Sequence, residues 1–257
     1  MKNAFASTEK ILAIETATSI GGVALFEGGR LLAEYRSRMP MTHAERVMVL
    51  VDRVLRDAAV RPVEIGALVL SIGPGSFTGL RVGINTAKGF AAGEDLRVAT
   101  VSTLETLGGN IPSPGALVCA MLDAKKGEVY TALFRIGENG LPERITDDGV
   151  LPADLAVGDI SGRCSESVIF LGDGAEKYRH NIQVKLGERA LFVPEELGHP
   201  SPAVLGRLGW IRLQQGALED IHTLEPVYLR RSEAEVKWEK GIRPRGSVLS
   251  SEKGSAR

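Results

Sequence analysis

Residues 71–84 read Ser-Ile-Gly-Pro-Gly-Ser-Phe-Thr-Gly-Leu-Arg-Val-Gly-Ile, and they connect a strand to a helix through a tight loop. The apolar run at 67–72 is typical of a buried strand. The Gly-Pro-Gly sequence at 73–75 interrupts both helix and strand, and Thr78 belongs to the residue types that cap helices. The sequence therefore predicts a strand, a sharp turn and a helix that runs from Thr78 to Ala92.

The predicted helix carries small residues at every fourth position. They are Gly79, Gly83, Ala87 and Ala91, with Leu80 and Ile84 beside them. Because a glycine inside a helix costs about 1 kcal/mol relative to alanine, such a ridge indicates that another element packs closely against it. Either another element of the same chain or a helix of a partner could be that neighbour.

Length, composition and charge favour a folded, cytoplasmic protein. The 257 residues are 44% hydrophobic, and 31 Lys and Arg balance 32 Asp and Glu, so no overall charge attracts the chain to RNA or to an anionic membrane. The apolar run 11–14 near the N-terminus is too short for a signal peptide or a membrane span. Cys119 and Cys164 have no CxxC partner, which predicts reduced thiols and no zinc cluster.

The N-terminal part predicts a meander of three strands followed by a helix. Strands are expected at 10–14, 23–26 and 31–37, and Thr42 is expected to cap a helix over 43–59. Apolar residues cover more than half of the circumference of this helix, which is wider than the stripe needed to lie on one sheet. The sequence therefore predicts that the helix buries two faces.

A later part of the chain repeats the beginning. Residues 11–26 align without a gap on residues 119–134, at a constant offset of 108 residues that places Glu15 on Asp123. Breakers at 108–115 separate the two copies. We therefore expect a duplicated βββαβ unit, with two similar domains facing each other across a cleft. A chance match of two strands is the alternative.

The expected domain boundaries follow from these breakers and from the C-terminal composition. The first domain covers residues 1–107. The second covers 108–232 and includes a helix over 202–216 and an extended segment at 224–230. Residues 233–257 have too few apolar side chains to form a core, which predicts a disordered tail.

Four stretches together resemble the TsaB (YeaZ) family. They are Ile14-Glu15-Thr16-Ala17-Thr18, the stretch 71–83, Leu122-Asp123-Ala124-Lys125-Lys126-Gly127-Glu128-Val129-Tyr130, and Pro226-Val227-Tyr228-Leu229-Arg230. The match extends over about residues 10–232, and the segment 73–81 is a long and specific signature. The chain departs from the family at Glu15, where Asp is usual, and in a longer C-terminal tail.

This resemblance implies an α/β fold of the duplicated actin-like, Hsp70-like ATPase (ribonuclease H-like) type, with two similar domains of mixed sheets and helices. It also implies a non-catalytic subunit in the synthesis of threonylcarbamoyladenosine on tRNA. The implied partners are a paralogous, metal-dependent threonylcarbamoyltransferase and an ATPase subunit of the same complex. Alone, the chain would form a homodimer, and tRNA would contact it only indirectly.

The resemblance places the partner on the helices over 43–59 and 78–92, as half of a four-helix bundle. The residues expected at that interface are Val47, Leu50, Val51, Val54, Gly79, Leu80, Gly83, Ile84, Ala87 and Ala91. The wide apolar surface of the first helix and the small ridge of the second fit this role. A leucine at position 83 is then expected to abolish partner binding and to leave the monomer folded.

No catalytic residue and no metal ligand is expected. The catalytic relatives carry a metal on an HxxxH pair, whereas the fourth residue after His43 is Val47. In actin-like ATPases acids hold a magnesium-bound nucleotide, and the candidates here are Glu15, Asp123 and Asp173. The alternative role of these acids is to accept backbone N–H groups in tight turns.

We therefore expect an accessory subunit that binds and activates a threonylcarbamoyltransferase and needs no cofactor of its own. The alternative is a stand-alone ATP-using enzyme of the same fold, either an ATPase or a small-molecule kinase. That alternative predicts ATP turnover by the chain alone, lost when Glu15 or Asp123 is replaced by alanine. A metallopeptidase is disfavoured by the missing second histidine.

Overall fold

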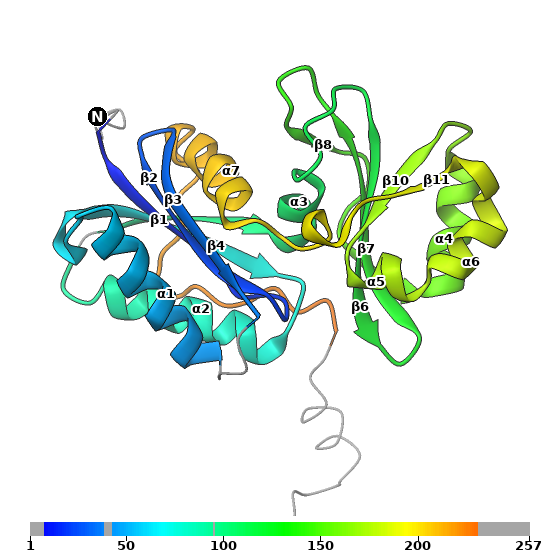
Figure 1. Cartoon of the computed structure of the whole chain (residues 1–257). Helices are drawn as coiled ribbons and strands as arrows, with labels where there is room; N and C mark the ends of the chain where they lie inside the picture. Colours follow the sequence, from blue (N-terminus) through cyan, green and yellow to red (C-terminus); the bar gives the residue numbers. More distant parts are fainter. Residues whose placement is uncertain (1–7, 39–42, 95, 231–257) are drawn as a thin grey trace, which may run out of the picture.

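The computed structural model describes residues 8–38, 43–94 and 96–230. These residues form two α/β units side by side, each built on one mixed β-sheet with helices on its faces (Figure 1). The chain completes the strands of the first sheet before it begins those of the second. The predicted tail (residues 233–257) and the predicted helix cap Thr42 lie outside the described residues.

The first sheet has the strand order β3-β2-β1-β4-β5. Its strands are β1 (Lys10–Glu15), β2 (Gly21–Glu27), β3 (Arg30–Ser37), β4 (Ile65–Gly73) and β5 (Arg97–Ser102). Strands β1 to β3 form the antiparallel meander that the sequence predicts, and β4 and β5 continue the sheet in parallel with β1. Because both faces of the sheet are covered, nearly every residue of β1, β2 and β4 is buried.

Helices α1 (His43–Asp57) and α2 (Phe77–Phe90) cover one face of this sheet (Figure 1). A short 3-10 helix, η1 (Pro62–Glu64), leads from α1 into β4. Helix α2 begins one residue earlier than predicted, because Ser76 and not Thr78 caps it. The Ser76 backbone is extended, and its hydroxyl accepts a hydrogen bond from the N–H of Gly79 at 3.2 Å.

The second sheet has the strand order β11-β10-β6-β7-β8, and β9 also pairs with β7. Its strands are β6 (Leu117–Lys125), β7 (Glu128–Ile136), β8 (Pro142–Arg144), β9 (Gly149–Pro152), β10 (Val168–Leu171) and β11 (Ala190–Phe192). The helical elements of this unit are α4 (Ala153–Arg163), α5 (Asp173–Lys177), α6 (Arg179–Leu186), η2 (Gly187–Arg189) and η3 (Glu195–Leu197). Helices α4 and α6 cover the outer face of the sheet (Figure 1).

Two further helices each cross to the other unit. Helix α3 (Thr103–Gly108) follows β5, but its Leu104 packs in one core cluster with β6 and β7. Helix α7 (Pro202–Gln214) follows the second sheet, but it packs on the first. A Cβ atom at Gly209 would lie 2.1 Å from Val69 of β4, so the glycines of α7 permit this close contact. The expected domain boundary at residue 108 therefore assigns α7 to the second domain, although α7 packs on the sheet of the first.

The two predicted copies are both hairpins, but their pairing differs by one residue. Ile11 pairs with Phe26, whereas Cys119 pairs with Leu133 and not with Phe134. The β6–β7 turn is shorter, and the register shifts between Asp123 and Lys125. Side chains alternate along a strand. The gapless overlay therefore matches the residues of β1 that face α1 and α2 with residues of β6 that face away from α4 and α6.

The C-terminal segment 217–230 returns along the first unit and then reaches the second. The N–H of Glu219 donates to the carbonyl of Val98 at 2.8 Å, and the N–H of Val227 donates to the carbonyl of Ile72 at 2.9 Å. Arg230 then donates to the carbonyl of Ala124 at 2.5 Å. The extended stretch predicted at 224–230 is therefore a strap across both units.

Candidate functional site

The ten side chains and glycines predicted to meet a partner are buried inside the chain. They are Val47, Leu50, Val51, Val54, Gly79, Leu80, Gly83, Ile84, Ala87 and Ala91. All of the apolar members except Leu80 share one core cluster with Leu12 and Leu25 of the sheet. Both helices lie on the same sheet face and against each other, so the wide apolar surface of α1 is used within the unit. These residues build the core and are not an exposed interface.

One position of the small ridge of α2, Gly83, lies against the loop after β1, while Ala87 and Ala91 pack in the core with α1. A Cβ atom at Gly83 would lie 2.4 Å from Oγ1 of Thr16, and one at Gly75 would lie 2.4 Å from the carbonyl oxygen of Ala17. The N–H of Ser76 donates to that same carbonyl at 2.7 Å. Gly83 and Gly75 therefore allow the loop after β1 to pack closely, and a leucine at Gly83 is expected to destabilise the monomer, against the prediction that it leaves the monomer folded.

The outward side of α1 and α2 carries different apolar residues. Met48 is 52% exposed and Val63, next to α1 in space, is 72% exposed. A groove of about 580 Å³ runs between them and α2. We call this surface the α1–α2 face, and its residues are Met48, Pro62, Val63, Asn85, Thr86, Gly89 and Phe90. A side chain added at Gly89 would meet no atom within 4 Å, so this glycine faces open space.

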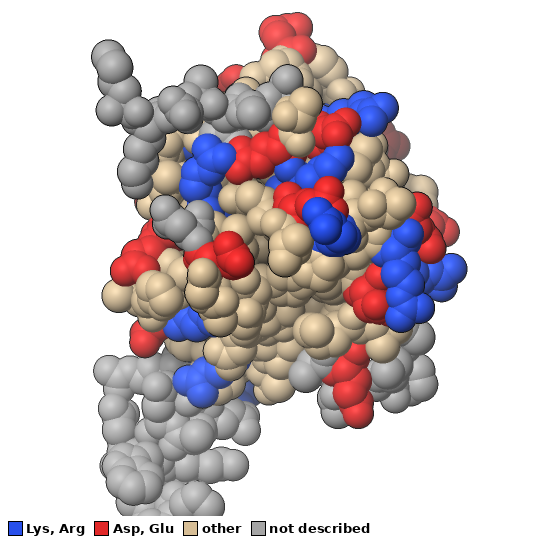
Figure 2. Space-filling view, turned by 90° about the vertical axis from the view of Figure 1, so that its left-hand side faces the viewer, with Lys and Arg blue, Asp and Glu red and all other residues tan. Residues whose placement is uncertain are grey.

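Charged pairs border the apolar surface along α1. Arg56 pairs with Asp52 at 2.5 Å, and Arg53 lies 3.7 Å from Asp57. Figure 2 views the molecule from the left-hand side of Figure 1 and shows an uncharged area surrounded by charged side chains. An apolar centre with a polar rim is the arrangement found in protein–protein interfaces.

A cleft of about 480 Å³ lies between the two units and brings two of the three predicted acids together. Asp123 and Asp173 both line it, opposite the Gly75-Ser76 turn of the first unit. The carboxylate of Asp173 accepts the N–H of Asp123 at 2.9 Å. This bond joins two distant segments, whereas the turn chemistry that is the alternative role appears at Asp123 itself, whose carboxylate accepts the N–H of Lys125 at 3.0 Å.

Two lysines neutralise Asp123. Nζ of Lys125 lies 2.8 Å from its carboxylate, and Nζ of Lys177 lies 2.9 Å from it. Partial burial opposes ionisation, but the hydrogen bonds from Lys125 and Lys177 outweigh it and hold the pKa of Asp123 below its ordinary value. The carboxylate is ionised and already occupied by two ammonium groups, so it is a poor ligand for a magnesium ion.

Glu15 lies beneath the cleft and does not line it. One carboxylate oxygen accepts the N–H of Ala17 at 2.7 Å, while the other finds no hydrogen-bond partner in the described part of the chain. Burial raises the pKa of Glu15 to about 7, although the Ala17 N–H and the Ser71 hydroxyl act in the opposite direction. Glu15 and the two aspartates therefore do not converge on one nucleotide.

The metal-binding pattern of the catalytic relatives is not reproduced around α1. Val47, the fourth residue after His43, is buried in the core, and the side chain of His43 lies outside the described residues. Within residues 8–38, 43–94 and 96–230, no group of three His, Cys, Asp or Glu side chains is arranged to hold a metal ion. The same residues contain no helix long and apolar enough to cross a membrane.

Sequence reasoning missed an aromatic contact at the mouth of the cleft. The rings of Phe77 and Tyr228 stack at 4.8 Å, and the guanidinium of Arg81 lies 4.1 Å from the ring centre of Phe77. Arg81 also donates to the hydroxyl of Tyr228 at 3.0 Å. The only sequence signal was the quoted stretch 226–230, which gave no indication that it would reach α2.

Comparisons with known proteins agree with one another. The family model described as TsaD, tRNA N6-adenosine threonylcarbamoyltransferase, matches residues 38–238. The tRNA threonylcarbamoyladenosine biosynthesis protein TsaB of Bacillus subtilis is 34% identical over 89% of this chain and 97% of its own length. The Escherichia coli protein of the same name is 32% identical over 90% of this chain and 97% of its own length.

Solved structures give the same fold. YeaZ from Pseudomonas aeruginosa has a TM-score of 0.71 and 25% identity, covering 86% of this chain and all (100%) of the YeaZ chain. The ethanolamine utilization protein EutJ from Carboxydothermus hydrogenoformans has a TM-score of 0.51 at 13% identity, which shows the fold alone. The expected actin-like α/β fold with two mixed sheets is confirmed.

Proposed function

The chain belongs to the TsaB family of tRNA threonylcarbamoyladenosine biosynthesis proteins, and we propose that it acts there as a non-catalytic subunit that binds a paralogous threonylcarbamoyltransferase through the α1–α2 face. Binding would support the active state of that enzyme. The ATPase subunit and tRNA would join the assembled complex, and tRNA would contact this chain only indirectly. The place of action would be the cytoplasm.

The exposed apolar groove of the α1–α2 face is the observation that supports this proposal. Met48 and Val63 stand out from a surface whose buried side already packs on the sheet. Large exposed apolar side chains beside a groove favour a protein partner. The open space above Gly89 leaves room for a partner helix to approach α2 closely. A specific interface of this kind buries about 800 Å² on each partner.

The state of the acids supports the non-catalytic part of the proposal. Asp123 is held by two lysines, and Glu15 is buried away from the cleft. Neither arrangement suits a magnesium-bound nucleotide, because magnesium binds carboxylates that are ionised and accessible. The stand-alone ATP-using enzyme would instead need both acids in the cleft. Steady ATP turnover by the purified chain, lost in Asp123→Ala, would favour that alternative.

Replacing Gly89 by arginine tests the interface. The long side chain would project into the groove, and its Cβ would meet no atom of the monomer within 4 Å. We expect Gly89→Arg to weaken binding to the threonylcarbamoyltransferase by at least about tenfold in titration calorimetry, since a charge would be buried at the interface. Unchanged affinity would overturn the proposed interface.

A matched control is available on the second unit. Gly162 lies near the end of α4, as Gly89 lies near the end of α2, and its Cβ position is also free of atoms within 4 Å. Gly162→Arg should leave partner binding unchanged. The same pair of variants tests the homodimer proposed for the isolated chain. Light scattering should show a monomer for Gly89→Arg and a dimer for Gly162→Arg.

A further inference from the structure

Strands β10 and β11 are parallel neighbours, and the chain leaves them towards opposite faces of the second sheet. After β10, α5 packs with α4 and α6, where Ala175 joins their core cluster. After β11, Val193 packs against a different core cluster, the one that contains the leucines of α3 on the opposite face of the sheet. A crevice at the carboxyl ends of two such strands is where ligands bind in open α/β sheets.

A cavity of about 630 Å³ occupies this crevice. The volume lies within the range of about 300–1,000 Å³ that is typical of small-molecule sites. The residues of its wall that concern binding are Arg38, Phe170, Arg179, Phe192 and His199. Of the described residues, Asp173 alone lines both this cavity and the cleft discussed above, so the two hollows are neighbours with different walls.

Two guanidinium groups in the cavity are held by carboxylates that can easily leave. Arg38 pairs with Glu195 at 2.8 Å, and Arg179 pairs with Glu176 at 2.6 Å. The side chains of Glu195 and Glu176 are 74% and 70% exposed. Because exposed ion pairs contribute little, an incoming anion could replace both glutamates at small cost. Arg179 is also fixed by stacking 4.0 Å from the ring centre of Phe192.

The part of the wall that contains His199 is held in place by hydrogen bonds. Nδ2 of Asn110 donates to the carbonyls of Leu197 at 2.8 Å and His199 at 2.7 Å. Arg38 donates to Nε2 of His199 at 3.2 Å, which requires a neutral imidazole. Burial, with the charge of Arg38, lowers the pKa of His199, so the neutral form persists at pH 7. These bonds fix the position of His199, which lies beside Arg38.

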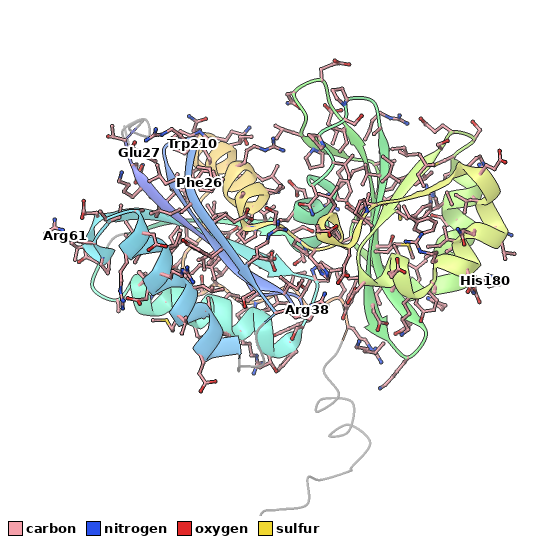
Figure 3. All side chains as sticks on the ribbon, viewed as in Figure 1. Phe26, Glu27, Arg38, Arg61, His180 and Trp210 are labelled. Carbon is pink, nitrogen blue, oxygen red and sulfur yellow. The ribbon has the colours of Figure 1, made fainter. Side chains whose placement is uncertain are left out.

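We infer that this crevice binds a small organic anion, with its phosphate or carboxylate between Arg38 and Arg179 and its apolar part against Phe192. Guanidinium groups suit this chemistry because their planar N–H donors match both oxyanions. Arg38 belongs to the first unit and lies at the junction of the two units (Figure 3), while Arg179 belongs to the second. An occupied site would therefore connect the units, independently of the α1–α2 face.

Titration calorimetry of the full chain with three probes tests this inference. Ribose 5-phosphate and AMP carry a phosphate, and citrate carries carboxylates, so the arms distinguish the two chemistries. We expect saturable binding of one chemistry at millimolar concentration or below. Arg38→Gln and Arg179→Gln should each weaken that binding about tenfold, and the double variant should abolish it.

Arg163→Gln is the matched control, because Arg163 is an exposed arginine on α4 that pairs with Asp159 outside the cavity. It should leave binding unchanged, and thermal unfolding should show that all variants remain folded. Failure of all three probes to bind would overturn the inference. So would binding that the double variant retains, or an equal loss in Arg163→Gln, which would indicate a general effect of charge.

Discussion

The hairpin β1–β2 and the hairpin β6–β7 are duplicated elements, yet their tips are stabilised in opposite ways. After β1, Thr16 is buried against α2 and Ala17 against the turn at Gly75 that precedes it, and Glu15 beside them is fully buried. After β6, residues 125–127 are exposed, and Asp123 beside them pairs with two lysines. The same strand pair can therefore end in a core or at a surface.

Because of this difference, Glu15 and Asp123 are not a symmetric pair of acids. Glu15 is a buried group whose ionisation opposes folding, whereas Asp123 is an ionised group that its neighbours stabilise. The cleft consequently presents Asp173 and the lysine-paired Asp123 from the second unit, and Ala17, Thr18 and Ser19 from the loop after β1. Substitutions at the two tips test this contrast.

Gly83→Leu should have the largest effect. A Cβ atom at this position would lie 2.4 Å from Oγ1 of Thr16, which is itself buried, so neither side can yield without disturbing the first tip. We expect a loss of about 3 kcal/mol or more in the free energy of unfolding, measured by chemical denaturation. A variant that folds with native stability would show that α2 does not clamp this loop.

Gly89→Leu on the same helix is the control for that prediction. It places the same side chain in open space, and replacing a helical glycine stabilises a helix by up to about 1 kcal/mol. We therefore expect native or slightly higher stability. Equal losses at both positions would mean that helix propensity or solubility, and not contact with Thr16, governs the result.

Glu15→Gln should remove a pH dependence of stability. The pKa of Glu15 is about 7 in the folded protein against an ordinary value of 4.5, so the folded state keeps a proton that the unfolded state releases between these values. The free energy of unfolding therefore falls as pH rises through this window, by about 3 kcal/mol in all. Denaturation curves from pH 4.5 to 8 should show this decline in the native protein and not in the variant.

Asp123→Asn provides the contrast in the second unit. The pKa of Asp123 is held below its ordinary value, so its stabilising effect is present above about pH 4 and is lost only as pH falls below that. The variant should retain the decline between pH 4.5 and 7 that Glu15 causes. If Asp123→Asn removed the decline and Glu15→Gln did not, the assignment of the two acids would be reversed.

Much of the fold could be predicted because strand periodicity and turn chemistry are local. The strands around Gly28 and the Gly-Pro-Gly turn at 73–75 were located from residue type alone. The crossing of α3 and α7 could not be predicted in this way, because an amphipathic helix does not specify which sheet it covers. The one-residue shift between the hairpins was also hidden, since Ala24 and Ala132 match in sequence whatever their register.

The candidate interface was only partly predictable for a related reason. Apolar periodicity identified the residues of α1 and α2 that are buried, such as Val54 and Ile84, but not what buries them. The apolar pattern does not distinguish the outward residues Met48 and Phe90 from the buried ones, because a groove between two helices depends on how the helices pack. Periodicity does not distinguish the inner faces of these helices from their outer ones, so the α1–α2 face could be identified only from the structure.

Lys126→Asn should have the smallest effect, on the second tip. Lys125 and Lys126 have positive φ angles of 64° and 53°, ahead of Gly127 at 84°. The left-handed region is unfavourable for lysine, and Asn-Gly is the preferred pair for a hairpin turn of this kind. We expect a gain of about 0.5–1 kcal/mol in the free energy of unfolding, measured by thermal or chemical denaturation.

The neighbouring position supplies the control for that gain. Lys125→Asn also relieves a positive φ angle, but it removes the ammonium group that pairs with Asp123 at 2.8 Å. Its gain should therefore be smaller than relief of the backbone alone would give, or absent. A loss of stability in Lys126→Asn would mean that the lysine side chain, and not its backbone, determines the stability of this tip. The second hairpin would then depend on side-chain contacts as the first one does.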